Sequence, residues 1–223
     1  MKFFFLFFVA FWYKFLYICK VNIQRIKFSM KHIYFFRHGE STLNVKNVLQ
    51  GHVHKPPLTE KGREQAKVIA QKLKNAQLEI MYTSPQTRAR QTAEIVNAFF
   101  RVPLLRDNKL KEMNLGDLDG LTMTEATEKY PEIIHAFLNS ENIDLSLRCP
   151  NGESFEELTK RAKTLFEEFV EISTFQSVAV SSHGMFLKYA LYGLGFKMDM
   201  PPSNAQVGHL VYNDGEWTFL GFI

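Results

Sequence analysis

Two arginines and two histidines stand just beyond apolar runs of the kind that form buried strands. Arg37 and His38 follow one such run, Arg88 lies shortly after a second, and His183 follows a third. If these runs are parallel strands, their carboxyl ends share one edge of a sheet, where ligands of α/β proteins bind. Guanidinium groups bind phosphate oxygens through bidentate hydrogen bonds, and an imidazole can serve as a nucleophile or a hydrogen-bond donor. This composition predicts a site for a phosphate group.

The elements that must position these side chains follow from the apolar periodicity. Short apolar runs bounded by polar loops predict strands, and apolar residues at i, i+3, i+4 and i+7 after a capping residue predict helices. Thr59 and Ser154 are expected helix caps, and Ser84 with Pro85 is the expected start of another helix. Expected strands are residues 32–36, 80–83, 177–180, 207–212 and 216–222, the last two forming a hairpin, and helices are expected after residues 59 and 154, at 84–99 and at 183–194.

Strands alternating with helices imply a three-layer α/β/α domain around a mostly parallel sheet. No repeat or long linker interrupts residues 30–223, whose length suits one domain. We therefore expect a single catalytic unit over residues 30–223.

Five motifs occur in this order along the chain and resemble those of the histidine phosphatase superfamily, in its phosphoglycerate mutase-like branch. They are R-H-G-E-S-x-x-N at 37–44, L-T-x-x-G-x-x-Q-A at 58–66, S-P-x-x-R-A-x-Q-T-A at 84–93, L-x-E-x-x-x-G at 110–116 and S-H-G at 182–184. A single R-H-G is a weak signal, whereas five ordered motifs at coherent positions are specific. The resemblance implies the phosphoglycerate mutase-like fold and spans nearly all of residues 30–223.

The resemblance also implies roles for individual residues. His38 would be the nucleophile that forms a phosphohistidine, Arg37 and Arg88 would clamp the non-bridging oxygens, and His183 would donate to them. Glu112 would protonate the leaving oxygen. Two neighbouring guanidinium groups favour the neutral form of His38 that nucleophilic attack requires.

Further phosphate or substrate contacts are expected at four positions. Asn44 and Gln50 offer amide groups, Gly51 allows a close backbone approach, and Gly184 can present a backbone N–H. Gly184 also distinguishes this H-G sequence from the H-D sequence of acid phosphatases, which disfavours phytase-like activity.

No metal or other cofactor is implied, because histidine and arginine supply the charge that a metal would supply. His52 and His54 form an H-x-H pattern, but no third ligand has helpful spacing. We expect these two histidines in a polar loop at the rim of the site.

The segment after Glu112 favours hydrolysis of a phosphomonoester over phosphoglycerate mutase-type transfer. Residues 115–150 hold Lys129 and Arg148 as their only Lys or Arg, against seven acidic residues, which is a poor environment for a doubly anionic sugar acid. A small phosphorylated metabolite is the favoured substrate. A phosphoprotein substrate and a catalytically silent binding module remain open alternatives.

Charge and cysteine content narrow the other possibilities. Residues 1–29 carry five basic residues and no acid, so the rest of the chain carries 22 basic and 23 acidic residues, of totals of 27 and 23. This near-neutral remainder argues against a nucleic-acid partner. Two cysteines, Cys19 and Cys149, provide no disulfide framework. The oligomeric state and the physiological substrate are left open by these patterns.

The hydrophobic and basic segment 1–29 has three interpretations. In the first, translation starts at Met30; in the second, the segment anchors the chain in a membrane; in the third, it is a signal peptide that lacks a recognisable cleavage site. We expect a cytoplasmic protein. With a real anchor, it would instead lie at the inner membrane with its catalytic domain facing the cytoplasm.

Overall fold

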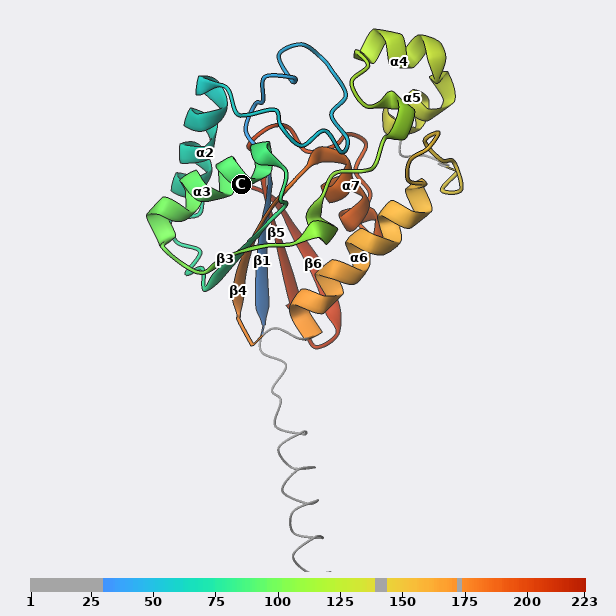
Figure 1. Cartoon of the computed structure of the whole chain (residues 1–223). Helices are drawn as coiled ribbons and strands as arrows, with labels where there is room; N and C mark the ends of the chain where they lie inside the picture. The colour runs from blue at the N-terminus through green and yellow to red at the C-terminus, as the bar shows by residue number, and fades with distance from the viewer. Residues whose placement is uncertain (1–29, 139–143, 172–173) are drawn as a thin grey trace, which may run out of the picture.

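The computed structural model describes residues 30–138, 144–171 and 174–223, so the interpretations of segment 1–29 fall outside the described residues. Its centre is a six-stranded sheet in the order β3-β2-β4-β1-β5-β6 (Figure 1). The strands are β1 (Lys31–Arg37), β2 (Ile80–Thr83), β3 (Leu104–Arg106), β4 (Ser177–Ser182), β5 (Val207–Asn213) and β6 (Glu216–Phe222).

The sheet is parallel over four strands and ends in an antiparallel hairpin. Strand β4 lies between β1 and β2 and is parallel to both, and β3 is parallel to β2. Strand β5 is antiparallel to β1 and to β6. The carboxyl ends of β1, β2 and β4 therefore meet at one edge, as the sequence predicts.

Helices cover both faces of the sheet and confirm the three-layer α/β/α architecture. The described helices are α2 (Glu60–Lys72), α3 (Thr87–Phe100), α4 (Met123–Lys129), α5 (Pro131–Leu138), α6 (Phe155–Glu171) and α7 (Gly184–Gly193), with 3-10 turns η1 (Asn108–Leu110) and η2 (Gly116–Leu118). Helices α2 and α3 pack on the face that carries Phe36. Helices α6 and α7 pack on the face that carries Phe35. Helices α4 and α5 lie beyond the carboxyl ends of the strands (Figure 1).

Two of the three expected helix starts are confirmed. The Thr59 hydroxyl accepts from the backbone N–H of Gly62 at 3.0 Å, and the Ser154 hydroxyl accepts from that of Glu157 at 3.1 Å. The expectation for Ser84 is wrong: α3 begins at Thr87, its N-cap is Gln86, and no side chain caps it. The Ser84 oxygen lies 2.8 Å from Nε2 of His183, so this hydroxyl serves the strand-end site in place of a helix cap.

In the described part of the chain, no helix combines the length and the apolar character that crossing a bilayer would require.

Candidate active site

The five proposed catalytic residues come together at the carboxyl edge of the sheet. Arg37 is the last residue of β1 and His38 follows it. Arg88 lies in the first turn of α3, Glu112 lies in the loop after η1, and His183 is the N-cap of α7. All except His183 line one cavity of about 930 Å³, and His183 is fully buried beneath it.

His38 is held as a neutral imidazole in one orientation. Its Nδ1 lies 2.8 Å from the carbonyl oxygen of Gly39, which can only accept, so the Nδ1 proton is donated there and Nε2 keeps its lone pair. Burial, followed by the charges of Arg88 and Arg37, holds the pKa of His38 well below its usual value. At neutral pH the ring therefore presents an unprotonated Nε2 to the cavity side of the site.

A close crossing of two backbones fixes the turn that carries His38. A Cβ placed on Gly39 would overlap the carbonyl of Gly62 in the first turn of α2, and a Cβ on Gly62 would overlap the carbonyl of Glu40. Only glycine allows this approach at both positions. The glycines of the first two motifs thus hold the β1–His38 turn against α2.

The Arg88 side chain is buried, and hydrogen bonds to three acceptors fix the orientation of its guanidinium group. Its Nε donates to Nε2 of His38 at 3.2 Å, and its two terminal nitrogens donate to the carbonyls of Val53 and Gly51 at 2.8 and 3.2 Å. Burial lowers the pKa of Arg88 to about 10, which still leaves a full charge at pH 7. The guanidinium therefore lies against the His38 lone pair, where an entering phosphoryl group would meet both.

Two nitrogens of this site are buried without a hydrogen-bond partner, of four such side-chain atoms in the described residues. They are Nε of Arg37 and Nδ1 of His183. Arg37 is held by a bond from its terminal nitrogen to the carbonyl of Pro202 at 2.8 Å. Nε2 of His183 lies 2.8 Å from the Ser84 hydroxyl, so Nδ1 is the ring nitrogen left for a ligand. Buried polar atoms without partners are costly, and the Nε–H of Arg37 is a donor that a bound anion would satisfy.

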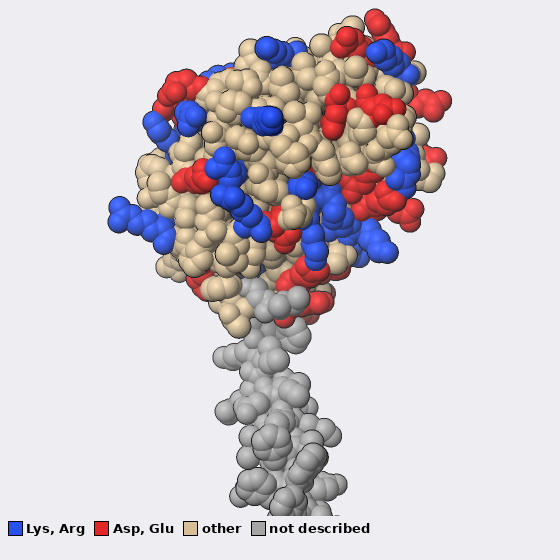
Figure 2. All heavy atoms as spheres, viewed as in Figure 1, with Lys and Arg blue, Asp and Glu red and all other residues tan. Residues whose placement is uncertain are grey.

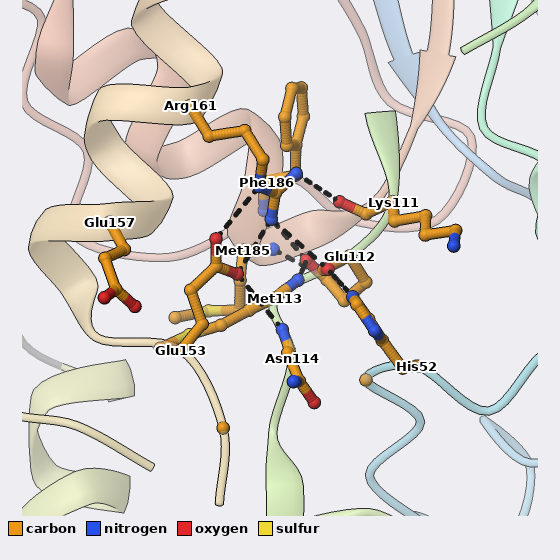
Figure 3. Close-up of polar contacts among 12 residues, drawn as sticks. His52, Lys111, Glu112, Met113, Asn114, Glu153, Glu157, Arg161, Met185 and Phe186 are labelled. Atoms are coloured by element: carbon orange, nitrogen blue, oxygen red, sulfur yellow. Dashed lines mark hydrogen bonds and ion pairs between the residues drawn. The ribbon is translucent and has the colours of Figure 1, made fainter. Parts of the chain in front are cut away.

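Glu112 is fixed on both its side chain and its backbone (Figure 3). Its carboxylate accepts from the backbone N–H groups of Phe186 and Met113 at 2.9 and 3.0 Å and from that of Met185 at 3.2 Å. The first turn of α7, whose dipole favours a negative group, supplies two of these donors. The carboxylate therefore has one defined position at the wall of the cavity.

The backbone of Glu112 is anchored by residues that the sequence motifs do not contain. Its N–H donates to Oε1 of Gln86 at 2.8 Å, and its carbonyl accepts from Nε2 of His52 at 3.0 Å and from Arg161 at 3.4 Å. Arg161 also donates to the carbonyl of Lys111 at 2.9 Å (Figure 3).

Glu153 holds Arg161 in turn. It binds the guanidinium through both carboxylate oxygens, at 2.9 and 2.8 Å. His52 lies in the loop after Gln50, and its half-buried ring also ties this loop, whose carbonyls bind Arg88, to Glu112.

The four expected accessory residues all line the cavity. Oδ1 of Asn44 accepts from the backbone N–H of Ser41 at 2.9 Å, which leaves its Nδ2 group for a ligand. Oε1 of Gln50 accepts from the Ser41 hydroxyl at 2.8 Å. Gly184 is the first residue of α7 and lies against the guanidinium of Arg37.

The backbone at Gly51 lies close to the carboxylate of Asp119, and this is the close approach that glycine allows here. A Cβ at Gly51 would overlap Oδ1 of Asp119, and the Gly51 carbonyl accepts from Gln86 at 2.6 Å as well as from Arg88. Asp119 accepts from the backbone N–H of His52 at 3.1 Å. Burial raises the pKa of Asp119 to about 6, and the nearby Glu112 adds to this effect.

The described residues contain no cluster of three or more His, Cys, Asp or Glu side chains that could hold a metal ion. Trp217 and Phe219 are partly buried and pack against the core that includes Phe35.

The comparisons with known proteins agree with this geometry. The model of the histidine phosphatase superfamily (branch 1) matches residues 33–222. The chain is 32% identical over 155 residues to a putative phosphoserine phosphatase 2 of Hydrogenobacter thermophilus, covering 70% of this chain and 74% of that protein. It is 26% identical over 202 residues to a probable phosphoglycerate mutase GpmB of Yersinia enterocolitica, covering 87% and 91%. The solved structure of Bacillus stearothermophilus YhfR superposes with a TM-score of 0.75 at 29% identity, covering 86% and 96%. The chain belongs to the histidine phosphatase superfamily, branch 1.

Proposed function

We propose that this chain is a phosphomonoesterase that hydrolyses a small phosphorylated metabolite through a phosphohistidine on His38, with residues 30–223 as its catalytic unit. The observation that carries the proposal is the buried, neutral Nε2 of His38 beside Arg88, with the unpartnered Nε of Arg37 and Nδ1 of His183 nearby. A nucleophile surrounded by anion donors suits attack on phosphorus.

In the first step, the Nε2 lone pair of His38 attacks phosphorus and the ester P–O bond breaks. Arg88 gives up its contact with Nε2 and donates to the transferring oxygens, together with Arg37 and His183. The leaving alkoxide takes a proton from Glu112, which becomes the carboxylate held by three backbone N–H groups.

In the second step, water attacks the phosphohistidine and the P–N bond breaks. Glu112 takes the proton that water loses, His38 recovers its lone pair, and inorganic phosphate leaves. The amide groups of Asn44 and Gln50 and the N–H of Gly184 would contact the bound phosphate or the alcohol beside it.

Phosphoglycerate mutase-type transfer is the second candidate because a relative is named a probable phosphoglycerate mutase. A mutase needs a second anion site beside the phosphohistidine. In the described part of the cavity wall, Lys46 is the only lysine or arginine besides Arg37 and Arg88. Arg148 is engaged by Glu157 and the carbonyl of Gly152. Acidic side chains gather over α4 and α5 (Figure 2). These features favour hydrolysis.

The test is labelling and phosphate release with two histidine variants. His38→Ala should abolish release of phosphate from p-nitrophenyl phosphate and remove acid-sensitive, base-stable labelling of the protein. His54→Ala is the matched control, because this histidine lies exposed in the neighbouring loop. Full turnover by the His38→Ala protein would contradict the proposed mechanism.

A further inference from the structure

The cavity above the proposed phosphate site has one polar end and one apolar wall. The polar end holds His38 with the arginines, the Glu112 carboxylate and the amides of Asn44 and Gln50. A phosphate ester bound there must place its alcohol in the remaining space. The residues that line that space therefore decide which alcohols the site accepts.

The apolar wall is assembled from segments far apart in the sequence. Val48 comes from the loop after β1, Leu115 precedes η2, Phe137 lies in α5 and Met185 lies in α7. The side chains of the last three are almost fully buried behind the surface of the cavity. An alcohol placed against them would exchange water for hydrocarbon contacts.

The exposed rim of the same cavity carries three large apolar side chains beside the polar Lys46, Asn47, Thr124 and Ser203. Met123, Leu138 and Met200 line it and are 37%, 46% and 53% exposed, respectively. Large hydrophobic side chains left in contact with water around one opening are typical of a ligand site. Two of the three are methionines, whose flexible thioethers adapt to ligands of different shape.

Charges along this wall are few. Apart from Glu112 and the two arginines of the phosphate site, Lys46 is the only charged side chain among the described lining residues. An alcohol that carries an ammonium or a carboxylate would lose hydration there with little compensation. The volume of about 930 Å³ is in the range of cavities that take ligands larger than a few carbon atoms.

We propose that this half of the cavity is a leaving-group subsite for an uncharged, largely apolar alcohol, such as an aryl or a medium-chain alkyl group. This inference rests on the proposed phosphomonoesterase function, because it assigns the phosphate to the His38 end. It selects against phosphoserine and phosphorylated sugar acids as preferred substrates.

The experiment is calorimetry with alkylphosphonates from methyl to hexyl, which carry the phosphonate on a P–C bond and are not hydrolysed. Each buried methylene contributes about 0.8 kcal/mol, so Kd should fall about two- to fourfold per added carbon until the wall is covered. Inorganic phosphate should displace hexylphosphonate, and hexanol alone should bind much more weakly. A series without dependence on chain length would overturn the subsite.

Variants of the cavity lining show which side chains contact the alkyl group of the phosphonate. In Met123→Gln/Met200→Gln, Kd for hexylphosphonate should rise several-fold while Kd for methylphosphonate stays the same. Val68→Gln, at an equally exposed residue of α2 outside this cavity, should change neither value. An unchanged hexyl preference in the double variant would place the apolar contact elsewhere and contradict the proposal.

Binding and turnover separate this inference from the function on which it rests. A steep phosphonate series without hydrolysis of any ester would leave the subsite standing and refute the phosphomonoesterase. Active hydrolysis that prefers phosphoserine or 3-phosphoglycerate over hexyl phosphate would refute the subsite and leave the phosphomonoesterase standing.

Discussion

Replacement of Glu112 by glutamine tests the proposed general acid with little change in shape. The carboxylate accepts three backbone N–H groups. A glutamine oxygen at the Oε1 position can keep the bonds from Met113 and Phe186, while its NH₂ group faces the N–H of Met185. One hydrogen bond is lost, at a cost of about 0.5–1.5 kcal/mol, so the variant should remain folded.

The rate effect should depend on the leaving group. An alkyl alkoxide must be protonated as the P–O bond breaks, so Glu112→Gln should slow phosphorylation of His38 by an alkyl phosphate by about 10² to 10⁴. A p-nitrophenolate leaves without a proton, and its first step should be slowed far less. Water attack on the phosphohistidine loses its base in both cases, so the phosphoenzyme should accumulate with the aryl ester.

The assay is stopped-flow release of p-nitrophenolate, compared with rapid-quench labelling of His38 by hexyl phosphate. We expect a burst of about one equivalent per active site from the variant with the aryl ester. The same large loss in the first step with both esters would show that Glu112 positions the site or binds phosphate, and the assignment of the general acid would be refuted.

Three further predictions concern the reaction type, the support of Glu112 and the stability of the fold. With 3-phosphoglycerate and a bisphosphate primer, phosphate release should far exceed formation of 2-phosphoglycerate; a dominant isomerase rate would reverse our choice. Arg161→Gln should lower the rate with hexyl phosphate about tenfold more than the rate with p-nitrophenyl phosphate, because Arg161 binds the backbone that carries Glu112. The control Lys163→Gln, on the exposed face of α6, should change neither rate. Equal losses with both esters would indicate that Arg161 has a structural role only. The urea midpoint should fall between pH 7 and pH 5 because His38 and His183 are buried in their neutral forms, and a constant midpoint would contradict this.

The sign of this pH effect follows from proton binding in the two states. Burial holds the pKa of His38 and of His183 well below 6.5, lowers the pKa of His209 to about 4, and also lowers the pKa values of His52 and His54. The unfolded chain therefore binds more protons once the pH falls below about 6.5, and the folded state loses stability. Asp119 acts in the opposite sense, because its raised pKa of about 6 makes the folded state bind a proton more readily than the unfolded chain. Five histidines in the described residues, against the one carboxyl group whose pKa is raised, give a net loss of stability toward acid.

Periodicity and capping residues were sufficient to predict the layers of this fold. The run after Lys31 is buried because Ile33, Phe35 and Phe36 enter the two hydrophobic cores, and the helix after Ser154 presents one apolar stripe to the sheet. The short elements α4 and α5 were not expected, since helices of seven and eight residues carry too few apolar positions for a clear period.

The motifs located the residues at the strand ends because parallel topology brings those ends together. The Ser84-Pro85 pair shows the limit of local patterns. Its two residues match a helix start, yet the Ser84 hydroxyl is 2.8 Å from a histidine that lies 99 positions further along the chain. A tertiary partner of this kind outweighs a cap worth about 1 kcal/mol, because it orients a buried imidazole.

The residues that support Glu112 could not be found by spacing, since they recognise backbone rather than side chains. Arg161 binds the carbonyls of Lys111 and Glu112, and the ring of His52 binds the same Glu112 carbonyl from another loop. Any residue type at positions 111 and 112 offers those carbonyls, so no pairing of side-chain chemistry along the sequence marks the contact. The sequence therefore identifies the group that is proposed to transfer the proton, whereas the fold alone determines how precisely that group is held.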